Sequence, residues 1–268
     1  MTIETTDTDQ NEPTWSEDPY SVDEGVGWRA HIGMVIYSND QTLPHEGRVM
    51  LNFPGVALFE SRIHAYRGTN QPLTAEGLSN TSGIEGAARL INTMRPSDVV
   101  AIGCTSAAMV IGNDELHRLV RRIHPNAQVT DPFTGIKAAL TATEAKRVGF
   151  ISPYPRDVAE RMTNGFQEAG FEIPVATTFK NPTGFVSDDA PFITPDSMAA
   201  ATRRLINETE LDTVVIACTQ MRAAEMIEAL EEETGKTIIS SNQALCWHAL
   251  RLAGCDDKID GWGRLFRS

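Results

Sequence analysis

The chain has 268 residues, 41% of them hydrophobic, which suits two domains of ordinary size or one large one. Its formal net charge is −13 and it has no basic stripe, so the composition argues against a nucleic-acid-binding protein. No apolar run approaches the roughly 18 residues of a membrane span. The four cysteines (104, 218, 246 and 255) and the scattered histidines lack the spacing of metal ligands, so we expect no metal site.

Residues 1–28 carry eight acidic side chains and neither lysine nor arginine. Because this segment also has few aliphatic residues, we predict an acidic, disordered tail. The body without the tail has a net charge of about −5, so the low pI says little about an active site. No basic segment followed by an apolar one marks a signal peptide, and we therefore expect a cytoplasmic protein with reduced thiols.

The first half of the chain alternates strands and helices. A strand over 29–37 ends in the turn Ser38–Asp40, whose polar side chains also suit ligand binding. A second strand covers 56–63, and a helix over 83–94 has Ser82 and Glu85 placed for a capping box. The later elements are a strand over 98–103, a helix over 113–123, a strand over 129–132 and a helix over 134–143.

The second half repeats this order. Its first predicted elements are a strand over 146–152, a helix over 158–169, a strand over 171–179 and a polar loop over 181–195. Pro174 indicates that the strand over 171–179 lies at a sheet edge or that the proline occupies an early position in it. A helix over 195–207, a strand over 212–217, a helix over 221–234, a strand over 237–240 and a helix over 243–252 capped by Ser241 and Asn242 follow. The alternation and the related strands indicate a duplicated α/β unit.

Two matched strands end in cysteines, Cys104 and Cys218, each six residues after an aspartate. The apolar runs are typical of parallel strands, so each thiol is expected at the carboxyl end of a strand and near a helix N-terminus. Backbone N–H groups there lower the pKa of a thiol. The same N–H groups, with the hydroxyls of Thr105, Ser106 and Thr219, suit a substrate carboxylate and the enediolate formed from it. Gln220, next in the chain, is a further candidate binding residue.

Two opposed thiols suit one task, in which one removes a proton from a carbon and the other returns it on the opposite face. A single cysteine after an apolar strand is more often a small buried hydrophobe. The matched pair in a duplicated fold favours the functional interpretation.

Four motifs together resemble the aspartate/glutamate racemase superfamily: Gly103–Ser106, Ala217–Gln220, Ser152–Tyr154 and Ser240–Trp247. The resemblance covers roughly residues 30–265 and is strongest to the branch with maleate cis–trans isomerases, arylmalonate decarboxylases and ectoine-utilisation proteins. It implies two pseudo-symmetric Rossmann-like halves with parallel sheets, an active site in the cleft between them, no cofactor, and a homodimer or higher homo-oligomer. The expected halves are 29–140 and 141–240, with 241–268 a helical segment packing back on the first half.

The resemblance also assigns roles. Cys104 and Cys218 resemble the two catalytic cysteines, and the groups that bind a substrate carboxylate correspond to Asn39, Thr105, Ser106 and Tyr154. Asn39 as a turn residue and Tyr154 as a surface phenol remain the plain alternatives. Arylmalonate decarboxylases have Gly at the first cysteine, so the presence of Cys104 makes a decarboxylase the second choice.

One residue departs from the maleate isomerase pattern. Asp189 stands where those enzymes have Asn, beside Asp188. If Asp189 faces the pocket it repels a second carboxylate and attracts a cationic group, which favours an amino acid or an ectoine over maleate. If Asp188 and Asp189 are both solvated loop acids, neither carboxylate selects between these substrates. We therefore expect an isomerase or racemase of a small carboxylic acid, with a non-catalytic binding protein as the alternative from another class.

Overall fold

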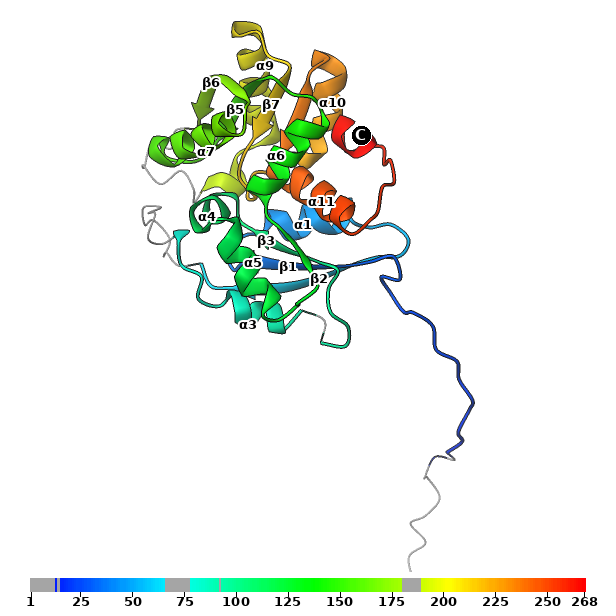
Figure 1. Cartoon of the computed structure of the whole chain (residues 1–268). Helices are drawn as coiled ribbons and strands as arrows, with labels where there is room; N and C mark the ends of the chain where they lie inside the picture. The colour runs from blue at the N-terminus through cyan, green and yellow to red at the C-terminus, as the bar shows by residue number, and fades with distance from the viewer. Residues whose placement is uncertain (1–12, 14, 66–77, 92, 180–188) are drawn as a thin grey trace, which may run out of the picture.

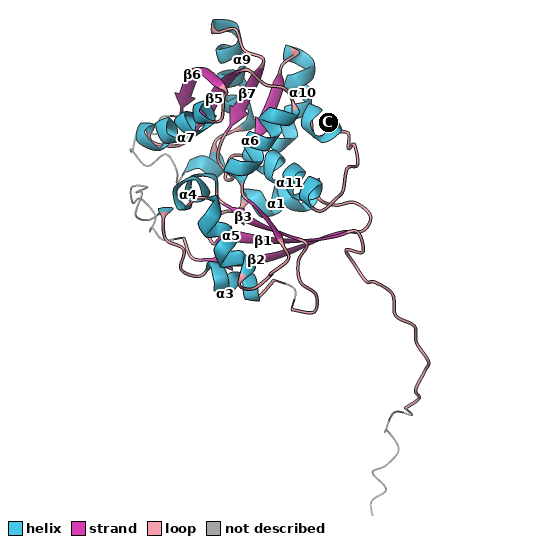
Figure 2. Ribbon diagram, in the orientation of Figure 1, coloured by secondary structure: helices cyan, strands magenta, loops and turns pink. Residues whose placement is uncertain are grey.

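Two four-stranded parallel sheets make up the framework of the computed structural model, which describes residue 13 and residues 15–65, 78–91, 93–179 and 189–268 (Figures 1 and 2). The strand order is β2-β1-β3-β4 in one sheet and β6-β5-β7-β8 in the other. The two orders are equivalent, so the predicted α/β fold with two related halves is confirmed. Their strands are β1 (Ala30–Tyr37), β2 (Val56–Ile63), β3 (Val99–Gly103), β4 (Gln128–Thr130), β5 (Arg147–Ser152), β6 (Glu172–Thr178), β7 (Thr213–Ile216) and β8 (Thr237–Ser240).

Helices follow most of the strands. The α-helices of the described residues are α1 (Thr42–Met50), α3 (Ile84–Arg89), α4 (Thr105–Ile111), α5 (Asn113–Arg121), α6 (Pro132–Ala142), α7 (Arg156–Glu168), α9 (Pro195–Glu208), α10 (Ala224–Thr234) and α11 (Ser241–Leu252). Two 3₁₀ helices, η1 (Ala190–Phe192) and η2 (Arg264–Arg267), add to them. β6 lies at an edge of its sheet, as Pro174 predicted, because a proline cannot donate to a second neighbour.

The chain order creates a switch point in each sheet. From β1 the chain moves outward to β2 and then returns to β3 on the other side of β1, and β5, β6 and β7 repeat this path. The register pairs Ile36 of β1 with Gly103 of β3, and Ile151 of β5 with Ile216 of β7. The residues after these four strands therefore leave the sheets together, at the places where open α/β sheets bind ligands.

One hydrophobic core joins the halves. It includes Ile32 and Ala101 of the first sheet and Phe150 and Val215 of the second, together with residues of α6 and α11. Helices α6 and α11 lie between the sheets (Figure 1). Gly135 of α6 allows a close crossing, because a Cβ there would lie 2.9 Å from the carbonyl oxygen of Ala244. The interior between the halves is thus packed by a helix pair.

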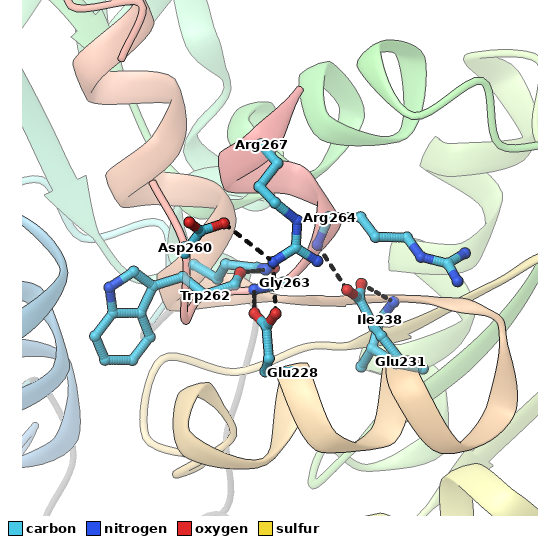
Figure 3. A network of polar contacts seen from close by, with 9 residues as sticks. Glu228, Glu231, Ile238, Asp260, Trp262, Gly263, Arg264 and Arg267 are labelled. Carbon is cyan, nitrogen blue, oxygen red and sulfur yellow. Dashed lines mark hydrogen bonds and ion pairs between the residues drawn. The ribbon is translucent and has the colours of Figure 1, made fainter. Parts of the chain in front are cut away.

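The segment after α11 returns to the second half. The backbone N–H of Gly263 donates to Glu228 Oε2 at 2.7 Å, and that of Arg264 donates to Glu231 Oε2 at 2.6 Å (Figure 3). The other oxygen of Glu231 accepts from Ile238 N at 2.9 Å. Helix α11 itself packs on α6, α1 and β3, so the two parts of 241–268 contact different halves.

Several helices start at other residues than predicted; α6 and α7, for example, each begin two residues earlier. Gly83, with φ 90°, precedes α3 and no side chain caps that helix, so the predicted capping box of Ser82 and Glu85 is wrong. Helix α10 begins at Ala224, three residues later than predicted. Ser240, not Ser241 or Asn242, caps α11, in a capping box with Gln243. This last difference frees the side chains of Ser241 and Asn242 for other contacts.

The N-terminal segment, as far as it is described, does not join the sheets. Residues 15–26 are exposed and extend away from the body (Figure 1). Among the described residues, no helix is both long enough and apolar enough to span a membrane.

Candidate active site

Four side chains converge from the carboxyl ends of the four inner strands. Asp40 follows β1, Cys104 follows β3, Tyr154 follows β5 and Cys218 follows β7. Each thiol is close enough to Tyr154 to shift the pKa of its phenol, and Asp40 raises the pKa of both thiols. Cys104 also raises the pKa of Cys218. The structure therefore brings the two predicted cysteines into one site, to which the first half supplies Asp40 and Cys104 and the second half supplies Tyr154 and Cys218.

Cys104 is the residue before helix α4. Its backbone is extended (φ −156°, ψ 117°), which lets Thr105 start the helix immediately after β3. The thiol is half-buried and lies 3.7 Å from the hydroxyl of Ser106. The backbone N–H groups of Ser106 and Ala107 point at the sulfur and lower its pKa. This geometry agrees with the predicted position at a helix N-terminus.

Cys218 is held differently. Its φ is 154°, a value that non-glycine residues rarely adopt, and it is 7% exposed. Helix α10 starts six residues further on, so the prediction of a helix N-terminus next to this thiol is wrong. The Cys218 N–H instead donates to Ser241 Oγ at 3.0 Å. Such backbone outliers persist only where surrounding contacts hold them, and they occur often at functional sites.

Tyr154 and Ser106 connect the two thiols. Burial raises the pKa of the Tyr154 phenol most, the nearby Cys218 thiol raises it further and the Ser106 hydroxyl lowers it, so these three groups lie close together. Since Ser106 also contacts Cys104, a continuous row of polar groups runs from one sulfur to the other. Tyr154 is 3% exposed, which rules out the alternative of a surface phenol.

Burial dominates the electrostatics of this row. It raises the pKa of Cys104, and it raises the pKa of Cys218 to about 12, against the smaller lowering effects of Tyr154 and of the Gln220 N–H. Burial also raises the pKa of Tyr154 well above its ordinary value. The expectation that backbone N–H groups leave a depressed thiol pKa is therefore wrong, because desolvation of the thiolate outweighs them. Near neutral pH all three groups hold their protons.

Ser241 links the loops that carry the cysteines. Its hydroxyl lies 2.9 Å from Thr105 Oγ1 and accepts from Cys218 N. Thr105 and Ser241 are fully buried. The Thr105 hydroxyl, predicted to bind substrate, therefore contacts the protein, and Ser241 is a site residue that sequence analysis placed only in a helix cap. Its motif, Ser240–Trp247, was the available signal.

The turn after β1 contributes Asp40 rather than Asn39. Asn39 is exposed, whereas Asp40 is buried and lies beside the Thr219 hydroxyl. The neighbouring Thr42 hydroxyl donates to the carbonyl oxygen of Gln220 at 2.9 Å. Thr219 and Gln220 thus belong to the loop that meets the start of α1. Sequence analysis considered the polar side chains of this turn as possible partners of a ligand but selected Asn39, not Asp40, as the candidate binding residue.

Asp189 is exposed and precedes η1. Asp188 lies outside the described residues. The structure does not place Asp189 among the groups around the thiols.

A second buried carboxyl supports the same loop. Glu46 of α1 accepts from Ala224 N at 3.1 Å and from Asn242 Nδ2 at 2.7 Å. Asn242 Nδ2 also donates to the Thr219 carbonyl oxygen at 2.8 Å. Burial raises the pKa of Glu46 to about 7, against the lowering effect of these two donors. Helices α1, α10 and α11 are thereby tied to the loop of Cys218.

The cysteines are all free thiols. In the described part of the chain, no three His, Cys, Asp or Glu side chains gather as metal ligands. The groups that the described residues supply around the two thiols are a phenol, hydroxyls, the Asp40 carboxyl and backbone N–H groups.

Comparisons with known proteins identify relatives over most of this length. A sequence profile of the arylmalonate decarboxylase family matches residues 32–266. A maleate isomerase of Nocardia farcinica is 26% identical over 246 residues, covering 88% of this chain and 95% of the relative. An arylmalonate decarboxylase of Bordetella bronchiseptica is 28% identical over 138 residues, covering 51% of this chain and 57% of that relative.

Solved structures agree with the fold. The maleate cis–trans isomerase of Nocardia farcinica, a cysteine-to-serine mutant with a covalently bound succinylcysteine intermediate, matches with a TM-score of 0.74 at 25% identity, covering 88% of this chain and 97% of that chain. The maleate isomerase Iso of Pseudomonas putida matches with a TM-score of 0.76 at 21% identity, covering 89% of this chain and 98% of that chain, which supports the fold alone.

These matches confirm the superfamily predicted from the four motifs. They also confirm the predicted class of enzyme, an isomerase, through the three maleate isomerases among the relatives. The profile covers every candidate site residue named above and, apart from the first two residues of β1, all the strands of both sheets. The chain belongs to the arylmalonate decarboxylase family.

Proposed function

We propose that Cys104 and Cys218 are the catalytic pair of a cofactor-independent isomerase or racemase that acts on a small carboxylic acid. The observation that carries this proposal is the polar row from Cys104 through Ser106 and Tyr154 to Cys218. Two thiols supplied by different halves, with a phenol between them, suit proton transfer on two faces of one carbon. The domain boundaries near 140 and 240 fit this arrangement, with the site between the halves.

For a substrate with an acidic α-hydrogen, the thiolate of one cysteine removes the proton. The electron pair moves into the carboxylate to form an enediolate, and the other thiol donates its proton to the opposite face. Hydroxyls and backbone N–H groups near Ser106, Thr219 and Gln220 would stabilise the added negative charge. The products are the inverted acid and a pair of cysteines with exchanged protonation states.

For a substrate with a conjugated cis double bond, a thiolate instead adds to one alkene carbon. A C–S bond forms while the electron pair of the double bond moves toward the carboxylate, and the other thiol protonates the neighbouring carbon. Rotation about the new single bond, loss of that proton and expulsion of the thiolate give the trans acid. The succinylcysteine in the Nocardia farcinica relative supports this route as an analogy.

The candidate binding residues fall into two groups. Ser106, Tyr154, Thr219 and Gln220 are proposed to contact the substrate. Thr105 is proposed to act through Ser241, by holding the two cysteine loops in place. Asn39 and Asp189 stay candidate binding residues; both are exposed.

The proposal extends to the substrate, the cellular location and the oligomeric state. Maleate-like diacids, amino acids and ectoine derivatives are the candidate substrates, and ectoine utilisation is the corresponding role. A cytoplasmic location and a homodimer or higher homo-oligomer complete the proposal; four free thiols suit a reducing compartment.

The test is a screen for solvent-deuterium incorporation at Cα over small amino acids, diacids and ectoines, with maleate-to-fumarate conversion followed in parallel. An active compound supports the proposal if Cys104→Ala and Cys218→Ala abolish the activity while Cys255→Ala, a buried thiol outside the row, retains it. Activity that survives in both site variants would refute the two-thiol mechanism.

A decarboxylase is the second candidate, favoured by the Bordetella bronchiseptica relative. Release of CO₂ from an arylmalonate, with no isomerisation of any acid in the screen, would select it. Tight binding without turnover would instead indicate a binding protein.

A further inference from the structure

Asp40 is a charged residue of the site that none of the proposed chemical steps uses. It is 2% exposed, and its Oδ1 accepts from the backbone N–H groups of Thr42 and Leu43, each at 2.9 Å. These bonds satisfy two free N–H groups at the start of α1, so part of its role is that of a helix cap. A cap needs only one of the two carboxyl oxygens.

The other oxygen, Oδ2, is buried and makes no hydrogen bond of good geometry within the described part of the chain. The Thr219 hydroxyl lies beside the carboxyl and lowers its pKa, while burial has the larger effect and raises it. Arg62 donates to the backbone carbonyl oxygens of Tyr37 and Asp40, at 3.2 and 3.0 Å, and its positive charge also lowers the pKa of Asp40, but less than burial raises it. A buried carboxyl oxygen without a donor is costly unless a ligand supplies one.

The place of Asp40 in the fold puts its carboxyl near the loops that carry Cys104 and Cys218. Asp40 follows β1 at the same end of the sheet as Cys104 follows β3, since Ile36 pairs with Gly103. The Thr42 hydroxyl, two residues after Asp40, donates to the Gln220 carbonyl oxygen at 2.9 Å, so the turn also lies against the loop of Cys218. The carboxyl is near enough to both thiols to add to the raised pKa that burial gives each of them. The other side chains along the row are neutral hydroxyls, thiols and a phenol. A carboxylate can bind to those donors, whereas a second carboxylate near Asp40 would meet a like charge.

We infer that Asp40 is a specificity-determining residue that binds a cationic nitrogen, so that the substrate is a carboxylate which also carries an ammonium or amidinium group. This inference rests on the proposed function, because it assumes that the substrate lies between Cys104 and Cys218. An N–H of the cation donates to Oδ2 and completes the hydrogen bonding of the carboxyl. The residue that selects the cation is thus Asp40 after β1, not Asp189.

The test measures binding by calorimetry with ligand pairs that differ in the nitrogen: alanine against lactate, and aspartate against malate. Maleate serves as the diacid, and ectoine distinguishes an amidinium from an ammonium. The wild-type protein is expected to bind the nitrogen-bearing member of at least one pair, or ectoine over maleate, at least about tenfold more tightly. In Asp40→Asn this preference is lost, since the amide keeps the Oδ1 acceptor but not the charge.

Asp131→Asn is the matched control. Asp131 is equally buried and caps α6 by accepting from Thr134 N at 2.9 Å, but it follows β4 and lies outside the row. It should leave the ligand preference unchanged. Wild-type binding of maleate, lactate or malate as tight as that of the nitrogen-bearing ligands would overturn the inference, and so would the absence of binding by every nitrogen-bearing ligand. Both of these outcomes are measured on the wild-type protein, so they do not depend on whether a variant folds.

The outcomes also separate the inference from the proposed function. Nitrogen-selective binding that depends on Asp40, without deuterium exchange or isomerisation, would uphold the inference and refute the enzyme mechanism. Isomerisation of maleate that depends on both cysteines and is unaffected by Asp40→Asn would do the reverse.

Discussion

The two halves share one strand order but present their cysteines in different ways. Cys104 is half-buried, has an extended backbone and begins a helix. Cys218 is buried, has a φ of 154° and precedes a turn, which Ser241 of α11 holds through the Cys218 N–H. A duplicated scaffold therefore need not give equivalent thiols. The difference indicates that α11 holds the backbone of Cys218 directly, whereas it reaches the loop of Cys104 only through the Thr105 hydroxyl.

The largest expected effect concerns the thiols themselves. If both transfer protons, Cys104→Ala and Cys218→Ala should each lower kcat by at least ~100-fold, the usual contribution of general acid–base catalysis. Steady-state kinetics on an active compound from the screen measure this. Near-normal turnover of either variant would contradict the two-thiol mechanism and would show that only the cysteine of the other half is catalytic.

The pH dependence of the rate tests the buried, neutral state of the pair. Burial raises the pKa of both thiols, and that of Cys218 to about 12, so the Cys218 thiolate is a minor species below that pH. Its fraction grows about tenfold per pH unit, so kcat/KM should rise by about that factor per unit between pH 6 and 9. A plateau beginning near pH 7 would mean that one thiol has a depressed pKa in the working enzyme.

Glu46 predicts a pH-dependent stability, because it joins α1 of the first half to the loop of Cys218. Its native pKa of about 7 lies above the ordinary value of 4.5, with burial as the main cause and Asp40 and Glu225 adding to it. Between these values the unfolded chain releases the proton that the native protein keeps. The contribution of Glu46 to the free energy of unfolding should therefore be largest below pH 4.5 and fall by on the order of 3 kcal/mol as pH rises through 7.

Urea unfolding from pH 4.5 to 8 measures this fall. Glu46→Gln should flatten the curve, whatever its effect on absolute stability, and the exposed Glu232→Gln should not. An unchanged slope in Glu46→Gln would assign the pH dependence to other groups.

The smallest effect is expected for Ser241→Ala, which tests how α11 holds the two cysteine loops. It removes the acceptor of the Cys218 N–H and the partner of the Thr105 hydroxyl. Leaving such buried groups without partners costs about 1–3 kcal/mol of stability. We expect kcat to fall with little change in KM, because Ser241 positions the cysteines.

Ser240→Ala is the control for this variant, since it removes the cap of the same helix and should cost about 1 kcal/mol without a comparable loss of kcat. Equal kinetic losses in the two variants would mean that α11 acts only through its stability.

Much of the fold follows from local patterns. The apolar runs that end at Cys104 and Cys218 predicted β3 and β7, and the alternating residues 56–63 predicted β2 with its observed bounds. Pro174 predicted an edge strand for a physical reason, its missing N–H. Ser82 and Glu85 failed as a capping box, because Gly83 adopts a positive φ that a local pairing rule does not foresee.

By itself, the sequence determined the two related α/β units, the two cysteines at strand ends and the superfamily, because periodicity and short motifs are local properties of the chain. Only the tertiary structure decided which neighbours the thiols have. Asp40 and Cys218 are 178 residues apart in the chain (218 − 40), and Ser241 and Cys104 are 137 apart (241 − 104). Burial, which raises the thiol pKa values, exists only once both halves have packed. Electrostatic character depends on desolvation and contact, and neither is present in an isolated segment.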